Sequence, residues 1–252
     1  MYSQLFDQIL IKENLVLQKI SEYLNTGRGG NVTYFGAHSF NVFYDEPDYR
    51  DTIQNHFDIY TDGIGIYWLL KYIFKYDVEK FNASDLNDKI FQFLADTKTK
   101  TLIIGGRFDH NLVAGKLASQ GIDGIYADGY DDVKDLSSIS RKIKESEAKV
   151  VILGMGVPLQ EKMALQLSRL DPHRIYICVG GFLEFYFGTV PRIPRPFRNL
   201  GVEWIFRIIT EPRRLWKRYF VGVPLFLFRS WKCSILTEKS KAEIAASFSS
   251  EL

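Results

Sequence analysis

Three apolar stretches, each followed directly by glycine, constrain the fold of this chain more than any other feature. They cover residues 100–104, 149–153 and 174–179, and the residues that follow begin with Gly105, Gly154 and Gly180. Strands that are apolar throughout and alternate with helices are typical of a parallel sheet with both faces covered. We therefore predict an α/β fold, a Rossmann-like and mostly parallel sheet with helices on both faces.

The rest of the chain up to residue 179 supplies more strands and helices in the same alternation. Further predicted strands cover residues 31–35, 57–60 and 124–127. Predicted helices cover residues 3–26, 47–55, 67–76, 84–96, 111–120, 136–146 and 159–170. Ser84 is the expected N-cap of the helix that ends at residue 96. One α/β domain therefore accounts for most of the 252 residues.

Charge divides the chain into two parts. Residues 191–232 hold ten Lys and Arg against two Glu, an excess of eight positive charges. Because the whole chain carries +2, the remainder carries −6. We predict a Rossmann-like domain over residues 1–193, a basic helical appendage over 194–236 and a flexible polar tail over 237–252. A basic appendage indicates an anionic partner, either acidic lipid or nucleic acid.

The composition of the appendage favours a lipid surface. Its arginines alternate with Trp204, Trp216, Tyr219 and Phe220, a mixture that suits an anionic interface. No nucleic-acid-binding motif is present, so we expect no nucleic-acid partner. The longest apolar run near the end, residues 220–228, is nine residues long, whereas a membrane-spanning helix needs about 20. We therefore expect contact from the surface of a membrane.

Several kinds of site find no support in the sequence. Cys178 and Cys233 fit neither a disulfide framework nor a metal site, and the four histidines lack zinc spacing. The cluster of Asp128, Asp131 and Asp132 is typical of a solvated turn. The N-terminus lacks the pattern of a signal peptide. We therefore expect a cytoplasmic protein that holds no metal.

Candidate chemistry lies where predicted strands end. Asp62 follows the strand at residues 57–60, at the edge where open α/β sheets bind ligands, and a carboxylate there can act as a general base. It can equally be a turn or N-cap aspartate. The glycines at 105, 106, 154 and 156 lie between a strand and a helix, where backbone can approach a phosphate. They do not complete a dinucleotide fingerprint, so no nicotinamide cofactor is expected.

Longer motifs point to a family. They are residues 61–65 (TDGIG), 154–161 (GMGVPLQE), 192–194 (RIP), 201–204 (GVEW), 207 (R), 211–214 (EPRR) and 218–219 (RY). Together they make residues 31–228 resemble the WecG/TagA/CpsF glycosyltransferase family (glycosyltransferase family 26). The resemblance implies an inverting hexosyltransferase of bacterial cell-surface polysaccharide synthesis that needs no metal and no cofactor. It implies a UDP-sugar donor, a polyprenyl-diphosphate-linked acceptor and docking at the inner face of the cell membrane.

The resemblance also assigns roles by position. Asp62 is then the catalytic base and Thr33 a nearby substrate contact. The expected nucleotide and diphosphate contacts are Gly105, Gly106, Gly154, Gly156, Gln160, Glu161, Arg192, Glu203 and Arg207. The expected contacts with the lipid diphosphate and the membrane are Arg213, Arg214 and Arg218.

The sequence departs from the family pattern at Gly36, where an asparagine is usual, and Asn41 lies further on. The loss of that asparagine motivates an alternative, a catalytically weak module that recruits partners to the membrane in the same pathway. Apolar surface near the appendage also makes a homo-oligomer possible away from the membrane.

Overall fold

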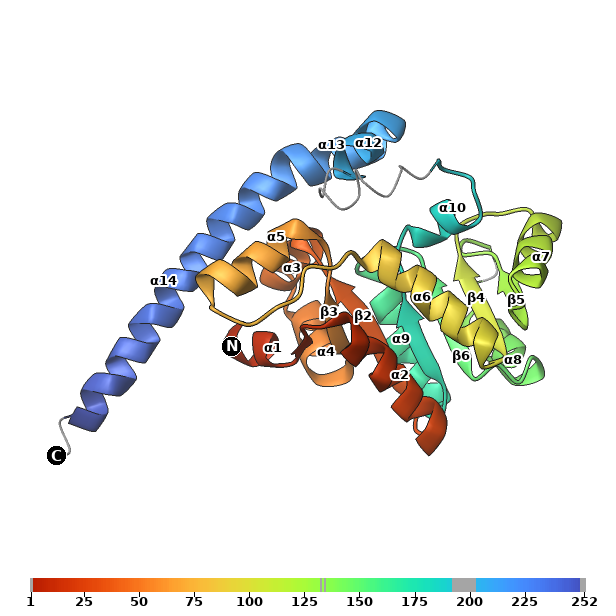
Figure 1. The fold of residues 1–252 in the computed structure, drawn as a ribbon, viewed down its shortest axis with the longest axis horizontal. Helices are drawn as coiled ribbons and strands as arrows, with labels where there is room; N and C mark the ends of the chain where they lie inside the picture. The colour runs from red at the N-terminus through yellow and green to blue at the C-terminus, as the bar shows by residue number, and fades with distance from the viewer. Residues whose placement is uncertain (1, 132, 134, 192–202, 250–252) are drawn as a thin grey trace.

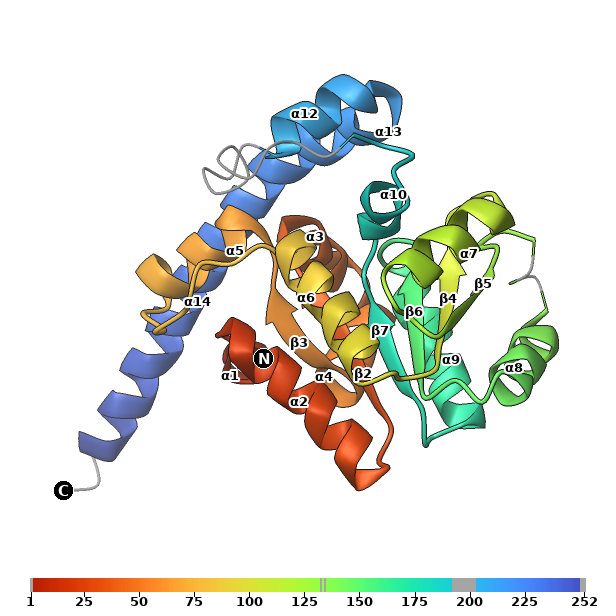
Figure 2. The same ribbon diagram turned by 45° about the vertical axis from the view of Figure 1, so that its right-hand side comes forward.

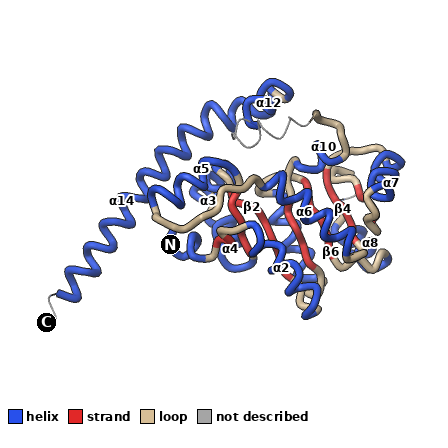
Figure 3. The backbone as a smooth tube through the Cα atoms, viewed as in Figure 1, coloured by secondary structure: helices blue, strands red, loops and turns tan. Residues whose placement is uncertain are grey.

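The computed structural model describes residues 2–131, 133, 135–191 and 203–249, with the backbone alone for 2–4, 203–204, 207, 214 and 236–249. Seven strands form a sheet in the order β1-β3-β2-β7-β6-β4-β5, and all pairs are parallel (Figure 1). The strands are β1 (Ile9–Leu10), β2 (Gly30–Phe35), β3 (Asp58–Thr61), β4 (Thr101–Gly105), β5 (Gly124–Ala127), β6 (Val150–Gly154) and β7 (Ile175–Cys178). The predicted α/β, Rossmann-like sheet is confirmed (Figure 3).

Helices cover both faces of the sheet, as predicted. One face carries α1 (Tyr2–Asp7), α3 (Ala37–Asp45), α4 (Pro47–His56), α8 (Leu136–Glu145) and α9 (Leu159–Leu170). The other carries α2 (Glu13–Thr26), α6 (Ala83–Asp96), α7 (His110–Ser119) and α10 (Phe182–Tyr186). Successive strand residues point to opposite faces. Leu102 and Ile104 therefore belong to one apolar cluster and Ile103 to the other.

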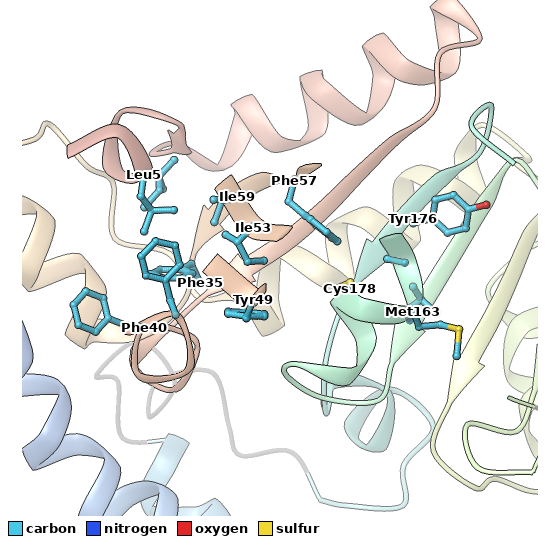
Figure 4. Close-up of a cluster of buried hydrophobic side chains, with 14 of the residues drawn as sticks. Leu5, Phe35, Phe40, Tyr49, Ile53, Phe57, Ile59, Met163, Tyr176 and Cys178 are labelled. Carbon is cyan, nitrogen blue, oxygen red and sulfur yellow. The ribbon is translucent and has the colours of Figure 1, made fainter. Parts of the chain in front are cut away.

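Aromatic side chains dominate the first cluster near the carboxyl end of β2. The ring of Phe35 meets those of Phe40 and Phe43 edge-on, at centroid distances of 6.3 and 5.7 Å. Figure 4 shows Phe35, Phe40 and Tyr49 gathered on this side of the sheet, with Cys178 beyond them. This packing fixes α3 and α4 against β2, and so sets the positions of the turns that follow β2 and β3.

The structure differs from the sequence-based prediction mainly near the N-terminus. The helix predicted over residues 3–26 is broken by β1, whose Ile9 and Leu10 pair with Ile59 and Tyr60 of β3. The apolar residues at helical spacing in this segment belong to the strand β1 and to two separate helices, α1 and α2. Helix α3 was not predicted. Two of its buried positions, Ser39 and Asn41, are polar, so its apolar residues alone do not mark the buried face. The N-cap of α6 is Asn82, whose side chain accepts from the Ser84 N–H at 2.8 Å, so Ser84 is not the cap.

The helix predicted over residues 67–76 begins earlier and is not a uniform α-helix. It comprises α5 (Gly63–Trp68), which starts directly after Asp62, and the π-helix η1 (Leu69–Ile73).

Helices of the C-terminal region lie across the carboxyl edge of the sheet (Figures 1 and 2). They are α12 (Glu203–Thr210), α13 (Pro212–Trp216), the π-helix η3 (Lys217–Val221) and α14 (Gly222–Ser249). Pro212 occupies the first turn of α13, where its missing N–H costs nothing. Helix α14 continues to Ser249, through most of the residues predicted to form a tail.

Candidate active site

A large cavity opens at the carboxyl edge of the sheet. Its volume is about 1770 Å³. Each strand from β2 to β7 contributes lining at or just beyond its end, through Gly36, Asp62, Gly106, Gly129, Gly154 and Gly180. We call these strand ends the floor. The opposite wall, the roof, is formed by residues 215–227 of α13, η3 and α14. Ligands of open α/β sheets bind at this edge, which makes the cavity the candidate active site.

Asp62 lies on the floor, between β3 and α5. It occupies the N-cap position of α5, yet its side chain makes no capping hydrogen bond to that helix. Its Oδ1 instead accepts from the backbone N–H of Ala83 at 3.3 Å. The side chain is half-buried and lines the cavity. This geometry favours the general base over the ordinary cap, because the carboxylate is held by a strand end and faces the space where a hydroxyl can bind.

Gly36 lies next to this carboxylate. A Cβ at position 36 would lie 3.3 Å from the backbone oxygen of Asp62 and 3.5 Å from its Oδ2. A side chain here would be in ordinary contact with the carboxylate and slightly tight against the backbone oxygen, whereas glycine leaves that part of the cavity open. Asn41 also lines the cavity, but its amide Nδ2 donates to the Gly222 carbonyl at 2.7 Å. Asn41 is thus engaged with the roof.

Thr33, Gln160 and Glu161 form a buried network beneath the floor. All three side chains are 0% exposed. Glu161 Oε1 accepts from Thr33 Oγ1 and from Gln160 Nε2, each at 2.8 Å. Gln160 Oε1 in turn accepts from the N–H of Gly180, at 3.0 Å. These residues were predicted to contact substrate or nucleotide, and the structure places all three outside the lining of the cavity.

The network has a structural consequence for the cavity. It joins β2, α9 and the turn after β7, and Gly180 in that turn lines the floor. The second oxygen of Glu161, Oε2, has no hydrogen-bond partner among the described residues. Burial raises the pKa of Glu161, although the Gln160 and Thr33 hydrogen bonds oppose this. Burial thus favours a neutral carboxyl group, which carries no unpaired charge into the interior.

The predicted glycine turns divide into two kinds. Gly106, Gly154 and Gly156 line the cavity. Gly156 has φ +79°, and a Cβ there would meet no atom within 4 Å, so its backbone is open to a ligand. Gly105 does not line the cavity and packs instead. A Cβ on it would lie 2.5 Å from the carbonyl oxygen of Gly154, so only glycine lets β4 and β6 approach so closely.

The roof brings cations and aromatic rings over the floor. Trp216, Lys217, Arg218, Tyr219 and Phe220 all line the cavity. Of the predicted lipid-diphosphate contacts, Arg218 is therefore in the cavity, whereas Arg213 is exposed and outside its lining.

Other predicted site residues fall outside what the structure describes. Arg192 lies in the segment 192–202, which is not among the described residues. Glu203 and Arg207 lie in α12 and Arg214 lies in α13, and their side chains are likewise outside the described part.

A group of contacts between α14 and α3 holds the roof in place. Arg229 is 9% exposed and forms a two-pronged ion pair with Asp45, at 2.9 and 2.5 Å. The same guanidinium donates to the carbonyl and the side-chain oxygen of Asn41, at 3.0 and 3.2 Å, and stacks over the Tyr44 ring at 4.5 Å. Phe226 is 2% exposed and meets Phe40 edge-on at 5.2 Å. The appendage is therefore packed into the core of the α/β domain.

Two lining residues on β2 and α3 were not predicted from the sequence. Tyr34 and His38 line the cavity, and Arg218 of the roof acts electrostatically on both. Burial, helped by Arg218, lowers the pKa of His38 to about 4. His38 is thus neutral at physiological pH. Its nearness to the predicted strand end at Phe35 was the available signal, which the absence of zinc spacing obscured.

Comparison with known families agrees with this geometry. A family model described as the glycosyl transferase WecG/TagA/CpsF family matches residues 6–240. The chain belongs to this family. The match covers both the sheet and the helices of the roof, so both are parts of a WecG/TagA/CpsF glycosyltransferase. Membership assigns glycosyl transfer in the synthesis of cell-surface polysaccharides.

Two further observations concern the described residues as a whole. No cluster of three or more His, Cys, Asp and Glu side chains suited to a metal ion occurs among the described residues. Within the same part of the chain, no helix is both long enough and apolar enough to span a membrane.

Proposed function

We propose that this glycosyltransferase moves a sugar, of the N-acetylmannosamine type or another hexose, from a UDP-sugar to a polyprenyl-diphosphate-linked sugar with inversion. The observation that carries the proposal is the cavity itself. One continuous space is lined by Asp62 on the floor and by Arg218 on the roof. It thus offers a base for the hydroxyl that attacks and a cation for the diphosphate that leaves.

The proposed reaction has two partners on opposite sides of the anomeric carbon. Asp62 accepts the proton of the acceptor hydroxyl as the oxygen of that group bonds to the anomeric carbon. The bond to UDP breaks on the other face, and its electron pair leaves with the diphosphate. Arg218, Lys217 and the open backbone at Gly156 support the proposal, because all three line the cavity and can stabilise that charge. In this proposal the reaction needs no metal ion.

The proposal also places the enzyme at the inner face of the cell membrane. Residues 212–235 contain six Lys and Arg and no Asp or Glu. Exposed Phe220, Phe228 and Trp231 lie in the same segment. Cationic and aromatic side chains together favour an anionic lipid surface, which is where a polyprenyl-linked acceptor resides.

The test is transfer from a panel of UDP-sugars to a short-chain lipid-diphosphate acceptor. We expect Asp62→Asn to lower transfer by about 10²–10⁴-fold, the usual contribution of a general base, while UDP binding measured by calorimetry persists. Asp77→Asn is the matched control, because its side chain is 94% exposed and pairs with Lys12 at 3.5 Å. Full activity in Asp62→Asn would contradict the assigned role.

A second candidate is the catalytically weak recruitment module. Gly36 favours it, because position 36 then contributes no polar side chain beside the Asp62 carboxylate. The same donor panel separates the two: robust turnover by the wild-type protein excludes the recruitment module, and UDP-sugar binding without turnover supports it.

A further inference from the structure

The segment that directly follows Asp62 has two unlike faces. We call residues 63–75, which span α5 and η1, the arm. Ile66, Leu69 and Leu70 of the arm are buried in the first apolar cluster. Trp68 and Tyr72 are 57% and 58% exposed. The arm is therefore fixed to the core by one face and presents large apolar and aromatic side chains on the other.

The exposed face of the arm is also cationic. Lys71 and Lys75 are exposed, and residues 63–76 contain no Asp or Glu. Lys71 Nζ lies 5.2 Å from the centroid of the Tyr67 ring and donates to its hydroxyl at 2.9 Å. Ile73 is exposed alongside them. The first acid after the arm is Asp77, which is 94% exposed and acts electrostatically on Lys71. Aromatic rings beside an excess of lysines are the composition of segments that lie in the headgroup region of an anionic bilayer.

The arm lies beside α14, as Figures 1 and 2 both show. At the contact, a Cβ on Gly65 would lie 3.1 Å from the Phe226 ring. Helix α14 buries Phe226 and Arg229 toward the body and exposes Leu227, Phe228 and Trp231. Two segments about 150 residues apart in the sequence thus present the same kind of surface next to each other.

This surface adjoins the cavity. Gly63, Ile64, Gly65 and Trp68 of the arm line the cavity, and so does Leu227 of α14. The exposed residues Tyr72, Ile73 and Phe228 lie just beyond that lining in the same two segments. Whatever covers this surface therefore lies next to the cavity that holds Asp62.

Charge distinguishes between two partners for this surface, a second copy of the chain and an anionic phospholipid surface. A two-fold contact of this surface with the same surface of a second copy would place the lysines of the arm and the cations of α14 against cations, because neither residues 63–76 nor residues 212–235 contain an acid. An anionic phospholipid surface complements both segments. We infer that the arm is a second membrane contact, which acts together with α14 and sets the cavity against the bilayer. The inference rests on the proposed function only in taking the acceptor to be carried by lipid.

The test compares full-length variants in co-sedimentation with vesicles of phosphatidylglycerol and phosphatidylcholine. We expect Tyr72→Ser/Ile73→Ser to weaken vesicle binding about 10-fold, since two side chains lose their place in the interface. The matched control is Leu112→Ser/Leu170→Ser, two leucines that are similarly exposed on α7 and α9. We expect Lys71→Glu to weaken binding several-fold and Lys144→Glu, an exposed lysine on α8, to have little effect.

Three measurements keep this inference separate from the proposed reaction. Thermal unfolding checks that each variant is folded, and transfer to a short-chain soluble acceptor should stay near wild type in Tyr72→Ser/Ile73→Ser. Wild-type vesicle binding by a folded arm variant would overturn the inference. A shift from dimer to monomer in analytical ultracentrifugation, with vesicle binding unchanged, would also overturn it and assign the surface to a second copy. Arm-dependent vesicle binding without any glycosyl transfer would reject the proposed reaction and leave the arm in place.

Discussion

The floor and the roof of the cavity are built on different principles. The floor consists of the ends of six parallel strands, supported by buried polar groups such as Thr33 and Gln160 that hydrogen-bond to one another. The roof, together with the rest of α14, consists of helices with two unlike faces: Phe226 and Arg229 are buried, whereas Phe220 lines the cavity and Phe228 is exposed. The difference indicates that the floor fixes geometry, whereas the roof supplies charge and surface contacts and is held to the body by the side chains that α14 buries against α3.

Removing the packing between α14 and α3 should have the largest effect on stability. Phe226 is 2% exposed against Phe40, whereas Phe228 is 59% exposed on the same helix. We expect Phe226→Ala to lower the free energy of unfolding by about 3–5 kcal/mol, through lost burial and the cavity left behind. Phe228→Ala should change it by about 0.5 kcal/mol or less. Urea unfolding measures both, and equal effects would show that the roof is not packed as part of the domain.

Changes in the buried network under the floor should have an intermediate effect on stability. The size of the loss should depend on whether residue 161 can still accept hydrogen bonds. Glu161→Leu leaves the Thr33 hydroxyl and the Gln160 amide without their acceptor, so we expect a loss of about 1–3 kcal/mol. Glu161→Gln keeps an acceptor oxygen and resembles the neutral acid that burial favours, so its cost should be smaller. Equal losses in the two variants would contradict a Glu161 that stabilises the fold by accepting these two hydrogen bonds.

His38, between floor and roof, should show the smallest effect and only in acid. Its pKa is about 4 in the folded protein and about 6.5 when unfolded, so the unfolded chain binds more protons between these values. Stability should therefore fall as the pH drops from 6.5 to 4. We expect this contribution, on the order of 1 kcal/mol at pH 5.5, to be absent in His38→Gln. The raised pKa of Glu161 makes stability change with pH in the opposite sense. The quantity to measure is therefore the difference in stability between His38→Gln and wild type across pH.

The floor was largely predictable from the sequence and the roof was not. Apolar strands that end in glycine mark the sheet and its carboxyl edge, and Asp62 at such an end follows from the pattern alone. Burial of Gln160 and Glu161 did not follow, because a motif shows which residues are together and not which way they face. The Arg229–Asp45 pair joins residues 184 positions apart, and nothing local marks either as a partner.

The same limit applied to the arm. A run of aromatic and aliphatic residues around Trp68 predicts a helix, and only the three-dimensional packing separates its buried face from its exposed one. Arg218 is a second example. The appendage contains seven arginines, and the sequence does not show which of them face the cavity. The structure places Arg218 in the cavity lining and Arg213 outside it.

The central claim is that the roof completes the active site above Asp62, and one comparison of two arginines tests it most directly. Transfer to a short-chain soluble acceptor is measured for Arg218→Gln and Arg213→Gln, so that membrane binding plays no part. Removing a cation that stabilises a leaving diphosphate typically costs about 10²–10³-fold in rate, and we predict a loss of this size for Arg218→Gln alone. Wild-type transfer by Arg218→Gln, or an equal loss in Arg213→Gln, would contradict the account.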